Sequence, residues 1–263
     1  MLTDKVCLVT GAASGMGRAT ALEMSRQGAR AVVVSDVNDD AGRAVAQEVT
    51  DLGAEGVYVH CDVSRSNEVR ALMAAVDERY GVLDVLHNNA GIVDAQLTTA
   101  RTVYDIDEEL WDRIFDVNVK GSWLCIKHAT TLLTKSAGGV IVNCASISSF
   151  VHFDAESAYV ASKSAILGLT RSAAVDLAPF GVRCVAYAPG TIDTPMNDRI
   201  WKQAPDEAAM RRALTATHLV PRLGRPEDIA KFVCFLASDD AAFITGSVHI
   251  IDGGALAWRG TAA

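Results

Sequence analysis

The sequence predicts an α/β fold in which one parallel β-sheet carries helices on both of its faces. Two observations lead to this prediction. Short apolar runs, typical of strands that are buried on both sides, alternate along the chain with longer segments of helical periodicity. The apolar runs end in polar or glycine-containing turns, which a parallel sheet gathers at one edge. There is no Gly/Ser-rich linker and no change of composition between the halves, so residues 1–263 are expected to form a single domain.

Seven segments have the length and apolar composition of buried strands. The first ends in a glycine-rich turn, and the second ends in the acid Asp36. The fourth is followed by Asn88 and Asn89. Together they predict a seven-stranded parallel sheet. The segments cover residues 5–10, 31–36, 55–61, 83–87, 140–145, 182–187 and 247–251.

The segments between these strands carry helical patterns. The first pattern follows the first strand and ends near Gly28, a residue type that favours helix ends. The last helix has Pro226 at its start, where proline is tolerated. The other helices are expected at residues 39–52, 67–80, 108–134, 157–180 and 226–237, with a charged helical piece at about 206–216.

Two stretches depart from this regular alternation. Asn118 lies inside the segment 108–134, which we expect to be one long helix, and an interior Asn either faces solvent or marks a buried or kinked site. Residues 191–225 are interrupted by three prolines and are long for a plain connection, so we expect a substrate flap there.

Composition argues against several classes of function. The formal net charge of −8 disfavours nucleic acid and anionic membranes as partners. No apolar run reaches the ~18 residues of a membrane span, and the N-terminus does not resemble a signal peptide, so we expect a cytoplasmic protein. The six cysteines lack a CxxC pair and are expected to be buried free thiols. The six histidines include no pair at ligand spacing, so no metal is expected.

The first strand, its glycine turn and the following helix have the order of a dinucleotide site. Gly11 and Gly17 lie in this turn, where a Cβ would block close approach to a pyrophosphate. The helix N-terminus then offers unpaired N–H groups to the phosphates. Asp36 ends the next strand, where a carboxylate accepts hydrogen bonds from ribose hydroxyls and repels a 2′-phosphate. The sequence therefore predicts NAD rather than NADP.

The stretch from Ser146 to Lys163 carries the candidate chemistry. Tyr159 and Lys163 are four residues apart, so on a helix they share one face. Ser146 follows an apolar run that is expected to be a strand. If the strand end lies over the helix, the Ser146 hydroxyl and the Tyr159 phenol can meet at one substrate oxygen.

Taken together, these motifs resemble those of the short-chain dehydrogenases/reductases over nearly the whole chain. The matching pieces are residues 10–17 (TGAASGMG), Asp62-Val63, residues 88–91 (NNAG), Asn118, Ser146, residues 159–163 (YVASK), Pro189-Gly190 with Thr194, and residues 252–254 (DGG). The resemblance implies a Rossmann-type doubly wound fold and an NAD-dependent alcohol dehydrogenase or ketoreductase. It also implies a homotetramer, with the helices at 108–134 and 157–180 packing against copies of themselves.

The resemblance assigns catalytic roles to four residues. Tyr159 would be the base in alcohol oxidation and the acid in ketone reduction, and Ser146 would hold the substrate oxygen. Lys163 would bind the nicotinamide ribose, and its cation would lower the Tyr159 pKa by up to about three units toward neutrality. Asn118 would position a water molecule that relays the proton to solvent.

The resemblance also assigns the cofactor contacts. The residues implied are Gly11, Ser14, Met16 and Gly17 at the pyrophosphate, Asp36 at the ribose, Asp62 and Val63 at the adenine, Asn89, Ala90 and Gly91 along the channel, Tyr159 and Lys163, and Pro189, Gly190, Ile192 and Thr194 at the nicotinamide end.

Substrate contacts are expected after Ser146 and in the flap. The candidate residues are Ser148, His152, Phe153, Thr191, Met196 and Trp201. They are largely apolar or aromatic, and no Arg or Lys among them would grip an anion. This favours a neutral, apolar or cyclic secondary alcohol or ketone. His152 and Asp154 either contact a second substrate oxygen or belong to a polar surface loop, and Trp201 either closes over the substrate or packs the flap down.

Two alternative functions remain open at this point. One is a 3-oxoacyl-carrier-protein reductase, which Asp36 and the absence of an obvious basic patch disfavour. The other is a non-catalytic NAD-binding regulator on the same scaffold. It would be marked by loss of Tyr159, Lys163 or Ser146, and all three are present.

Overall fold

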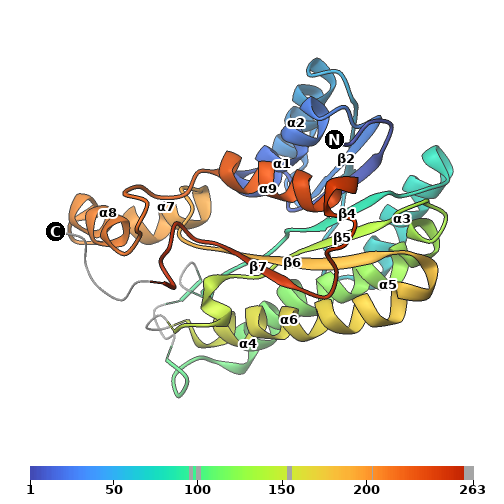
Figure 1. Ribbon diagram of the computed structural model, residues 1–263. Helices are drawn as coiled ribbons and strands as arrows, with labels where there is room; N and C mark the ends of the chain where they lie inside the picture. Colours follow the sequence, from blue (N-terminus) through green and yellow to red (C-terminus); the bar gives the residue numbers. More distant parts are fainter. Residues whose placement is uncertain (95–96, 99–101, 153–155, 203, 258–263) are drawn as a thin grey trace.

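Seven parallel strands form the central sheet of the protein (Figure 1). The structure is a computed structural model that describes residues 1–94, 97–98, 102–152, 156–202 and 204–257. The strand order is β3-β2-β1-β4-β5-β6-β7, which confirms the predicted seven-stranded parallel sheet. The strands are β1 (Val6–Thr10), β2 (Ala31–Asp36), β3 (Glu55–His60), β4 (Val85–Asn88), β5 (Val140–Cys144), β6 (Arg183–Pro189) and β7 (Val248–Ile251). Strand ends differ from the predicted ones by at most two residues, and those of β2 coincide with them.

The strand order reverses between β1 and β4. The chain builds outward from β1 through β2 to β3, then returns so that β4 pairs with the other side of β1. At such a point the connections leave the sheet in opposite directions, and a crevice opens beyond the carboxyl ends of the two strands. The turns that follow β1 and β4 are those that contain Gly11 and Asn89.

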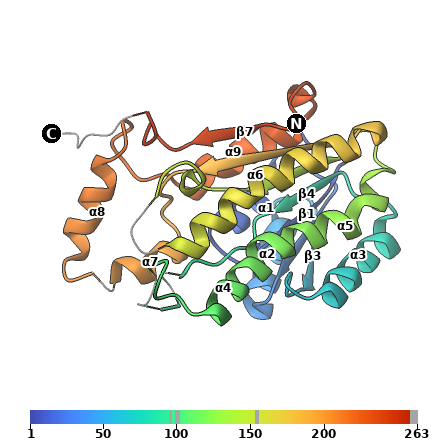
Figure 2. The same cartoon turned by 90° about the horizontal axis from the view of Figure 1, so that it is seen from below.

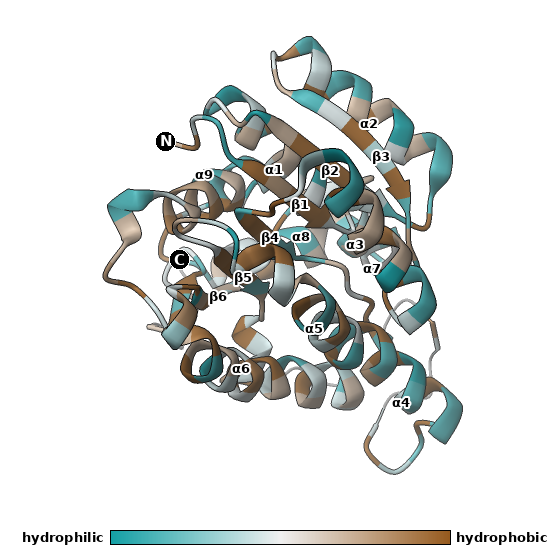
Figure 3. Ribbon diagram, turned by 90° about the vertical axis from the view of Figure 1, so that its right-hand side faces the viewer, coloured by the Kyte–Doolittle hydropathy of each residue, from teal (hydrophilic) through white to brown (hydrophobic). Residues whose placement is uncertain are grey.

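Helices cover both faces of the sheet, with one apolar core on each face. Successive residues of β1 belong alternately to these two cores. Cys7 and Val9 belong to one apolar core, whereas Val6 and Leu8 belong to the other. Figure 3 shows the strands as a largely apolar layer between the two groups of helices. On the first face lie α1 (Gly15–Arg26), α2 (Asp39–Asp51) and α9 (Pro226–Ala237), and on the second lie α3 (Ser66–Tyr80), α5 (Ser122–Leu133) and α6 (Ser157–Leu177). All six cysteines are buried with free thiols, as predicted.

The expected helix over residues 108–134 is confirmed as one unbroken helical segment, and the expectation that Asn118 marks a buried or kinked site in it is confirmed as well. The segment forms α4 (Glu108–Phe115), a π-helical turn (Asp116–Gly121) and then α5. The wider turn accommodates Asn118, which is buried and whose amide is hydrogen-bonded to the backbone of Ile92. The tertiary contact therefore decides the local backbone, and helical periodicity alone does not reveal it.

The segment 191–225 contains one helix that the sequence did not predict. Pro195 begins α7 (Pro195–Lys202) because its missing N–H is one that the first turn leaves unpaired in any case. The charged helix predicted at about 206–216 is α8 (Glu207–Ala216). Figures 1 and 2 show α7 and α8 together at one end of the sheet. Across the described residues, no helix combines the length and apolarity needed to cross a membrane.

Arg211 of α8 connects the parts of this segment. Its guanidinium carbon lies 4.0 Å from the centroid of the Trp201 ring. The same group is 3.3 Å from a carboxylate oxygen of Asp193 and 3.7 Å from one of Asp198, and its Nε is 3.3 Å from Glu207. Trp201 is only 1% exposed beneath it. Arg211 therefore ties α8 to α7 and to the chain that leads out of the sheet.

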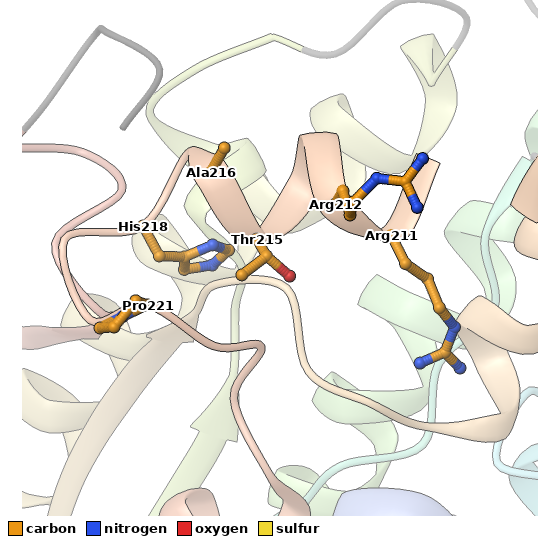
Figure 4. Close-up of a pocket in the computed structure, with 6 residues that line it drawn as sticks. All are labelled: Arg211, Arg212, Thr215, Ala216, His218 and Pro221. Carbon is orange, nitrogen blue, oxygen red and sulfur yellow. The ribbon is translucent and has the colours of Figure 1, made fainter. Parts of the chain in front are cut away.

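Arg212, the next residue on α8, provides an internal comparison. Both arginines line a surface pocket of about 320 Å³ together with His218, and their guanidinium groups point in different directions (Figure 4). Arg212 is exposed.

Replacement of Arg211 by alanine is expected to loosen α7 and α8 without unfolding the sheet. Loss of the cation–π contact and of the carboxylate partners weakens the attachment of α8 to α7, so amide exchange in both helices should become several-fold faster. Hydrogen exchange read by mass spectrometry measures this for peptides covering α7 and α8. Arg212→Ala is the matched control, and equal exchange in the two variants would contradict the role of Arg211.

Candidate active site

Lys163 connects the helix α6 to the end of strand β5. Its side chain is only 4% exposed, and its Nζ donates a hydrogen bond to the carbonyl oxygen of Cys144 at 2.8 Å. Cys144 is the last residue of β5, and Ser146 lies two residues beyond it. The hydrogen bond therefore holds α6 against the strand end that carries Ser146. Lys163 Nζ also lies 5.6 Å from the centroid of the Tyr159 ring.

Tyr159 and Ser146 meet as the sequence predicted. Burial is the largest influence on the phenol and raises the Tyr159 pKa, and the nearby Cys144, Glu156 and Asp94 raise it further. A side-chain hydrogen bond with Ser146 acts in the opposite direction and lowers it. The expected lowering of the Tyr159 pKa toward neutrality is therefore wrong for this structure, because burial of the phenol raises this pKa.

Asn118 is buried beside Lys163 rather than exposed. Its Oδ1 accepts a hydrogen bond from the Ile92 N–H at 2.9 Å, and its Nδ2 donates to the Ile92 carbonyl at 3.0 Å and to Ser162 Oγ at 2.9 Å. A Cβ on Gly91 would lie 3.3 Å from Asn118 Oδ1 and 3.5 Å from Lys163 Nζ. The four predicted catalytic residues thus lie around one point, although they come from three separate parts of the chain.

Asp94 is a buried acid that the sequence analysis missed. Its side chain is fully buried, and its Oδ2 accepts hydrogen bonds from the N–H groups of Ala158 at 3.1 Å and Tyr159 at 3.5 Å. These are among the N–H groups that the first turn of a helix leaves without intrahelical partners. Asp94 therefore caps the helix that carries Tyr159 from more than 60 positions earlier in the chain. No local sequence pattern predicts this contact.

A cleft of about 1090 Å³ opens at the strand reversal between β1 and β4. Ten of the residues predicted to bind the cofactor line it. They are Gly11, Ser14, Met16, Asp36, Asp62, Val63, Asn89, Ala90, Gly91 and Thr194. Six further residues predicted to bind the cofactor do not line this cleft, and Gly17 and Lys163 are two of them. Of these, Tyr159, Pro189, Gly190 and Ile192 line the adjoining cavity instead.

The glycine turn is shaped by close packing on both sides. Gly11 has a φ of +63°, and a Cβ there would lie 2.7 Å from the Ala90 Cα. A Cβ on Gly17 would overlap the Gly11 carbonyl oxygen. Asn89 completes the contact by donating from Nδ2 to the carbonyls of Thr10 and Gly11 at 3.1 and 3.0 Å. Ser14, the N-cap of α1, makes no side-chain capping bond.

Two acids lie in the cleft at the ends of neighbouring strands. Asp36 accepts hydrogen bonds from the N–H groups of Ala13 and Asn38, both at 3.0 Å. Asp62 accepts from the Ser64 N–H at 3.0 Å and hydroxyl at 2.7 Å. Its pKa is lowered overall, because these bonds and the nearby Arg65 outweigh burial, the largest single influence, which raises it. Backbone N–H groups hold the Asp36 carboxylate, whereas Asp62 is held by the backbone and side chain of Ser64 and by Arg65.

A smaller cavity of about 300 Å³ adjoins the cleft. Ser146 and Tyr159 line it, and Met16, Thr194 and Met196 line both spaces. Four predicted substrate residues also line it, namely Ser148, Thr191, Met196 and Trp201. His152 is exposed and does not line it, whereas Phe153 and Asp154 lie outside the described residues.

Several residues of this cavity were not predicted. Met210 and Leu214 are one turn apart on α8, and this apolar pair in a charged helix was the available signal. Glu156, three residues before Tyr159, had no such signal. The other unpredicted residues are Val93, Ile147 and Asn197. Within the described part of the chain, no group of His, Cys, Asp or Glu side chains is arranged to hold a metal ion.

Comparison with known proteins gives a consistent result. A family model described as enoyl-(acyl carrier protein) reductase matches residues 11–255. A 3β-hydroxysteroid dehydrogenase of Mediterraneibacter gnavus is 38% identical, covering 95% of this chain and 94% of its own. A cis-4-hydroxycyclohexanecarboxylate dehydrogenase of Sinomonas cyclohexanicum is 39% identical (95% and 96% covered), and a cyclopentanol dehydrogenase of Comamonas sp. is 38% identical (96% and 97% covered).

Solved structures agree with this result. The ligand-free aldohexose dehydrogenase of Thermoplasma acidophilum superposes with a TM-score of 0.86 at 33% identity, covering 99% of this chain and 97% of its own. A short-chain type dehydrogenase/reductase from Mycobacterium marinum superposes with a TM-score of 0.84 at 31% identity, covering 97% and 96%. The chain therefore belongs to the short-chain dehydrogenase/reductase family, whose oxidoreductases use NAD or NADP.

Proposed function

We propose that this protein is an NAD(H)-dependent dehydrogenase that interconverts a secondary alcohol and its ketone, with an uncharged apolar or cyclic substrate. The observation that carries the proposal is that Ser146 and Tyr159 line a small cavity that opens onto the dinucleotide-sized cleft. The mostly apolar lining, with Trp201, Met210 and Leu214, suits a ring or hydrocarbon body. Relatives named for cyclopentanol and a hydroxysteroid support a cyclic alcohol.

The residues of the cleft fit a nicotinamide dinucleotide. The Gly11–Gly17 turn and the N-terminus of α1 would hold the pyrophosphate, where the side-chain-uncapped start of the helix favours an anion. Asp36 would bind the ribose and Asp62 the adenine. Lys163 would donate to the second ribose, and Thr194 lies next to the glycine turn, since a Cβ on Gly15 would be 3.5 Å from its side chain. When bound, the cofactor supplies the acceptor or donor of the hydride.

The side chains of the small cavity would handle the proton and the oxygen. Ser146 would donate a hydrogen bond to the substrate oxygen, and Tyr159 would take or give the proton of that oxygen. Lys163 would keep its cation near the phenol while its hydrogen bond to Cys144 holds it in place. Asn118, bound to Ile92 and Ser162, would position the water that leads to solvent.

The raised Tyr159 pKa favours different pH values for the two directions. At neutral pH the phenol is protonated and can act directly as the acid in ketone reduction. Alcohol oxidation needs the phenolate, whose fraction grows as pH rises toward the pKa, so oxidation should accelerate in alkaline buffer.

A reductase of acyl-carrier-protein thioesters is the second candidate. The description of the matching family model favours it. Against it, the cleft is bordered on α4 by Glu108, Glu109 and Asp112, which would repel an acidic carrier protein. A non-catalytic NAD-binding regulator is disfavoured because Ser146 and Tyr159 line the cavity and Lys163 lies beside the Tyr159 ring.

We also propose a homotetramer and retain a single domain and a cytoplasmic location as predictions. Trp123 on α5, Val175 on α6 and Phe180 just after α6 are exposed apolar side chains. Such residues on adjacent helices suit packing against a second copy.

Replacement of Tyr159 by phenylalanine should abolish turnover and leave NADH binding nearly intact. The phenol is the proposed proton carrier, so a loss of about 10²–10⁴-fold or more is expected in kcat with a cyclic alcohol. A panel of cyclic, aromatic, steroid, sugar and hydroxyacyl alcohols with NAD, followed at the NADH absorbance, identifies the test substrate. Tyr104→Phe, at an exposed tyrosine, is the control. Parallel loss of turnover and NADH binding would argue against the base assignment.

Replacement of Ser146 by alanine should move the pH profile of alcohol oxidation upward. The Ser146 hydrogen bond lowers the Tyr159 pKa, so removing it raises that pKa further. The acid limb of kcat/KM should shift by roughly half to one pH unit toward alkaline pH, in addition to the loss of rate. Ser164→Ala on the exposed side of α6 should leave the limb unmoved. A limb unchanged by Ser146→Ala would refute the coupling.

Replacement of Asp36 by asparagine should reduce the preference for NAD over NADP. The wild type should favour NAD by kcat/KM because the carboxylate repels a 2′-phosphate, and removal of the charge should lower the ratio about 10-fold or more. Asp40→Asn, an exposed acid on α2, is the matched control. A wild-type preference for NADP would overturn the role of Asp36.

A further inference from the structure

His60 lies between the two segments that carry Asp36 and Asp62. It is the last residue of β3 and pairs in register with Asp36, the last residue of β2, and Asp62 follows it two residues later. The His60 side chain is half-exposed. Both acids line the large cleft, whereas His60 is not among the described residues that line it. His60 is therefore placed to act on the two acids through other side chains.

One nitrogen of His60 leads to Asp36. His60 Nδ1 lies 2.6 Å from Oδ1 of Asp39 at the start of α2, and because a carboxylate only accepts, the imidazole N–H donates. This hydrogen bond is the largest cause of the lowered pKa of the Asp39 carboxyl. The Tyr58 hydroxyl lies 2.8 Å from the same Oδ1 and 2.8 Å from the carbonyl oxygen of Asp36.

The Tyr58 hydroxyl has a single hydrogen for these two acceptors. His60 donates to Asp39 Oδ1, and Arg43 lies 3.2 Å from Asp39 Oδ2, so the Tyr58 hydrogen is available to the Asp36 carbonyl. Without His60 the carboxylate would be the stronger acceptor and would draw this hydrogen. Two oxygens 2.8 Å apart would then face each other at the end of β2 without a hydrogen between them, and Asp36 would shift.

The other nitrogen of His60 leads to Asp62. His60 Nε2 lies 3.7 Å from Glu68 Oε2, and the same oxygen accepts a hydrogen bond from the Asp62 N–H at 2.8 Å. Arg65 Nε lies 3.2 Å from the Asp62 carboxylate and 3.7 Å from the second oxygen of Glu68. The imidazole ring thus stands between a carboxylate that leads to Asp36 and one that holds Asp62.

We propose that His60 is a positioning residue for the adenosine half of the dinucleotide, which it serves by holding Asp36 and Asp62 in place. This inference rests on the NAD(H)-dependent function proposed above, in which Asp36 binds the ribose and Asp62 the adenine. Ser146 and Tyr159 line the separate, smaller cavity. Loss of His60 should therefore weaken dinucleotide binding and leave the turnover rate at saturation nearly unchanged.

The test measures the dissociation constants of NADH and of ADP-ribose, which lacks the nicotinamide, by titration calorimetry. His60→Ala should bind both ligands about 3- to 10-fold more weakly than the wild type, by the same factor. Its kcat at saturating NAD, with an alcohol that the wild type oxidises, should stay within about twofold. His128→Ala is the matched control, since this histidine of α5 lies 3.2 Å from Ser66 Oγ and should leave both affinities unchanged.

Two further variants separate positioning from a loss of packing. His60→Asn keeps an N–H donor close to the place of Nδ1 and should recover most of the affinity for both ligands. Tyr58→Phe removes the shared hydroxyl. In that background His60→Ala should weaken binding less than it does alone, because the two side chains act through one oxygen of Asp39.

Unchanged ADP-ribose binding in His60→Ala overturns the proposal. Equal weakening in His60→Ala and His60→Asn, full additivity with Tyr58→Phe, or a fall in kcat without a change in affinity also overturns it. The binding measurements need no alcohol. If the wild type binds NADH but oxidises no alcohol of the panel, the proposed dehydrogenase function fails and these affinities still decide the role of His60. A wild type that binds neither ligand overturns both.

Discussion

The hydrogen bond between the Lys163 ammonium and the Cys144 carbonyl holds the active site together. An ammonium group that is almost wholly buried must be satisfied, since an unpaired buried charge is far more costly than a hydrogen-bonded one. The carbonyl at the end of β5 satisfies it and fixes how far along the strand the helix α6 lies. The positions of Tyr159, one turn earlier on the helix, and of Ser146, two residues past the strand, follow from this contact.

Two acidic residues, Asp94 and Glu156, lie at the start of the helix α6. Asp94 accepts hydrogen bonds from backbone N–H groups of the first turn. The N-cap residue, Glu156, makes no side-chain capping hydrogen bond. Both carboxylates and the buried surroundings disfavour the phenolate of Tyr159, and the Ser146 hydroxyl is the group that favours it. The structure therefore describes a phenol whose resting state is the protonated one.

The sheet and the cleft at the strand reversal were predictable because they depend on local patterns. Buried parallel strands are apolar throughout, and a glycine turn between strand and helix has few other uses. What could not be predicted depends on contacts between distant segments. The sequence left open whether Asn118 faces solvent or marks a buried or kinked site, and its hydrogen bonds to the distant Ile92 decide between the two. The helix α7 begins at Pro195, whereas in sequence this proline suggests an interruption. No sequence pattern distinguishes Glu156 or Asp94 from other acidic residues. Their different surroundings become visible only in the fold.

The segment from Asn89 to Asp94 makes contacts at both of its ends. At one end Asn89 donates to the carbonyls of Thr10 and Gly11, and at the other Asp94 accepts from the first turn of α6. Six residues thus span the gap between the glycine turn that follows β1 and the helix that carries Tyr159. The number of residues in this bridge sets the separation of the two, so inserting or deleting a residue between Asn89 and Asp94 would displace the glycine turn relative to the start of α6.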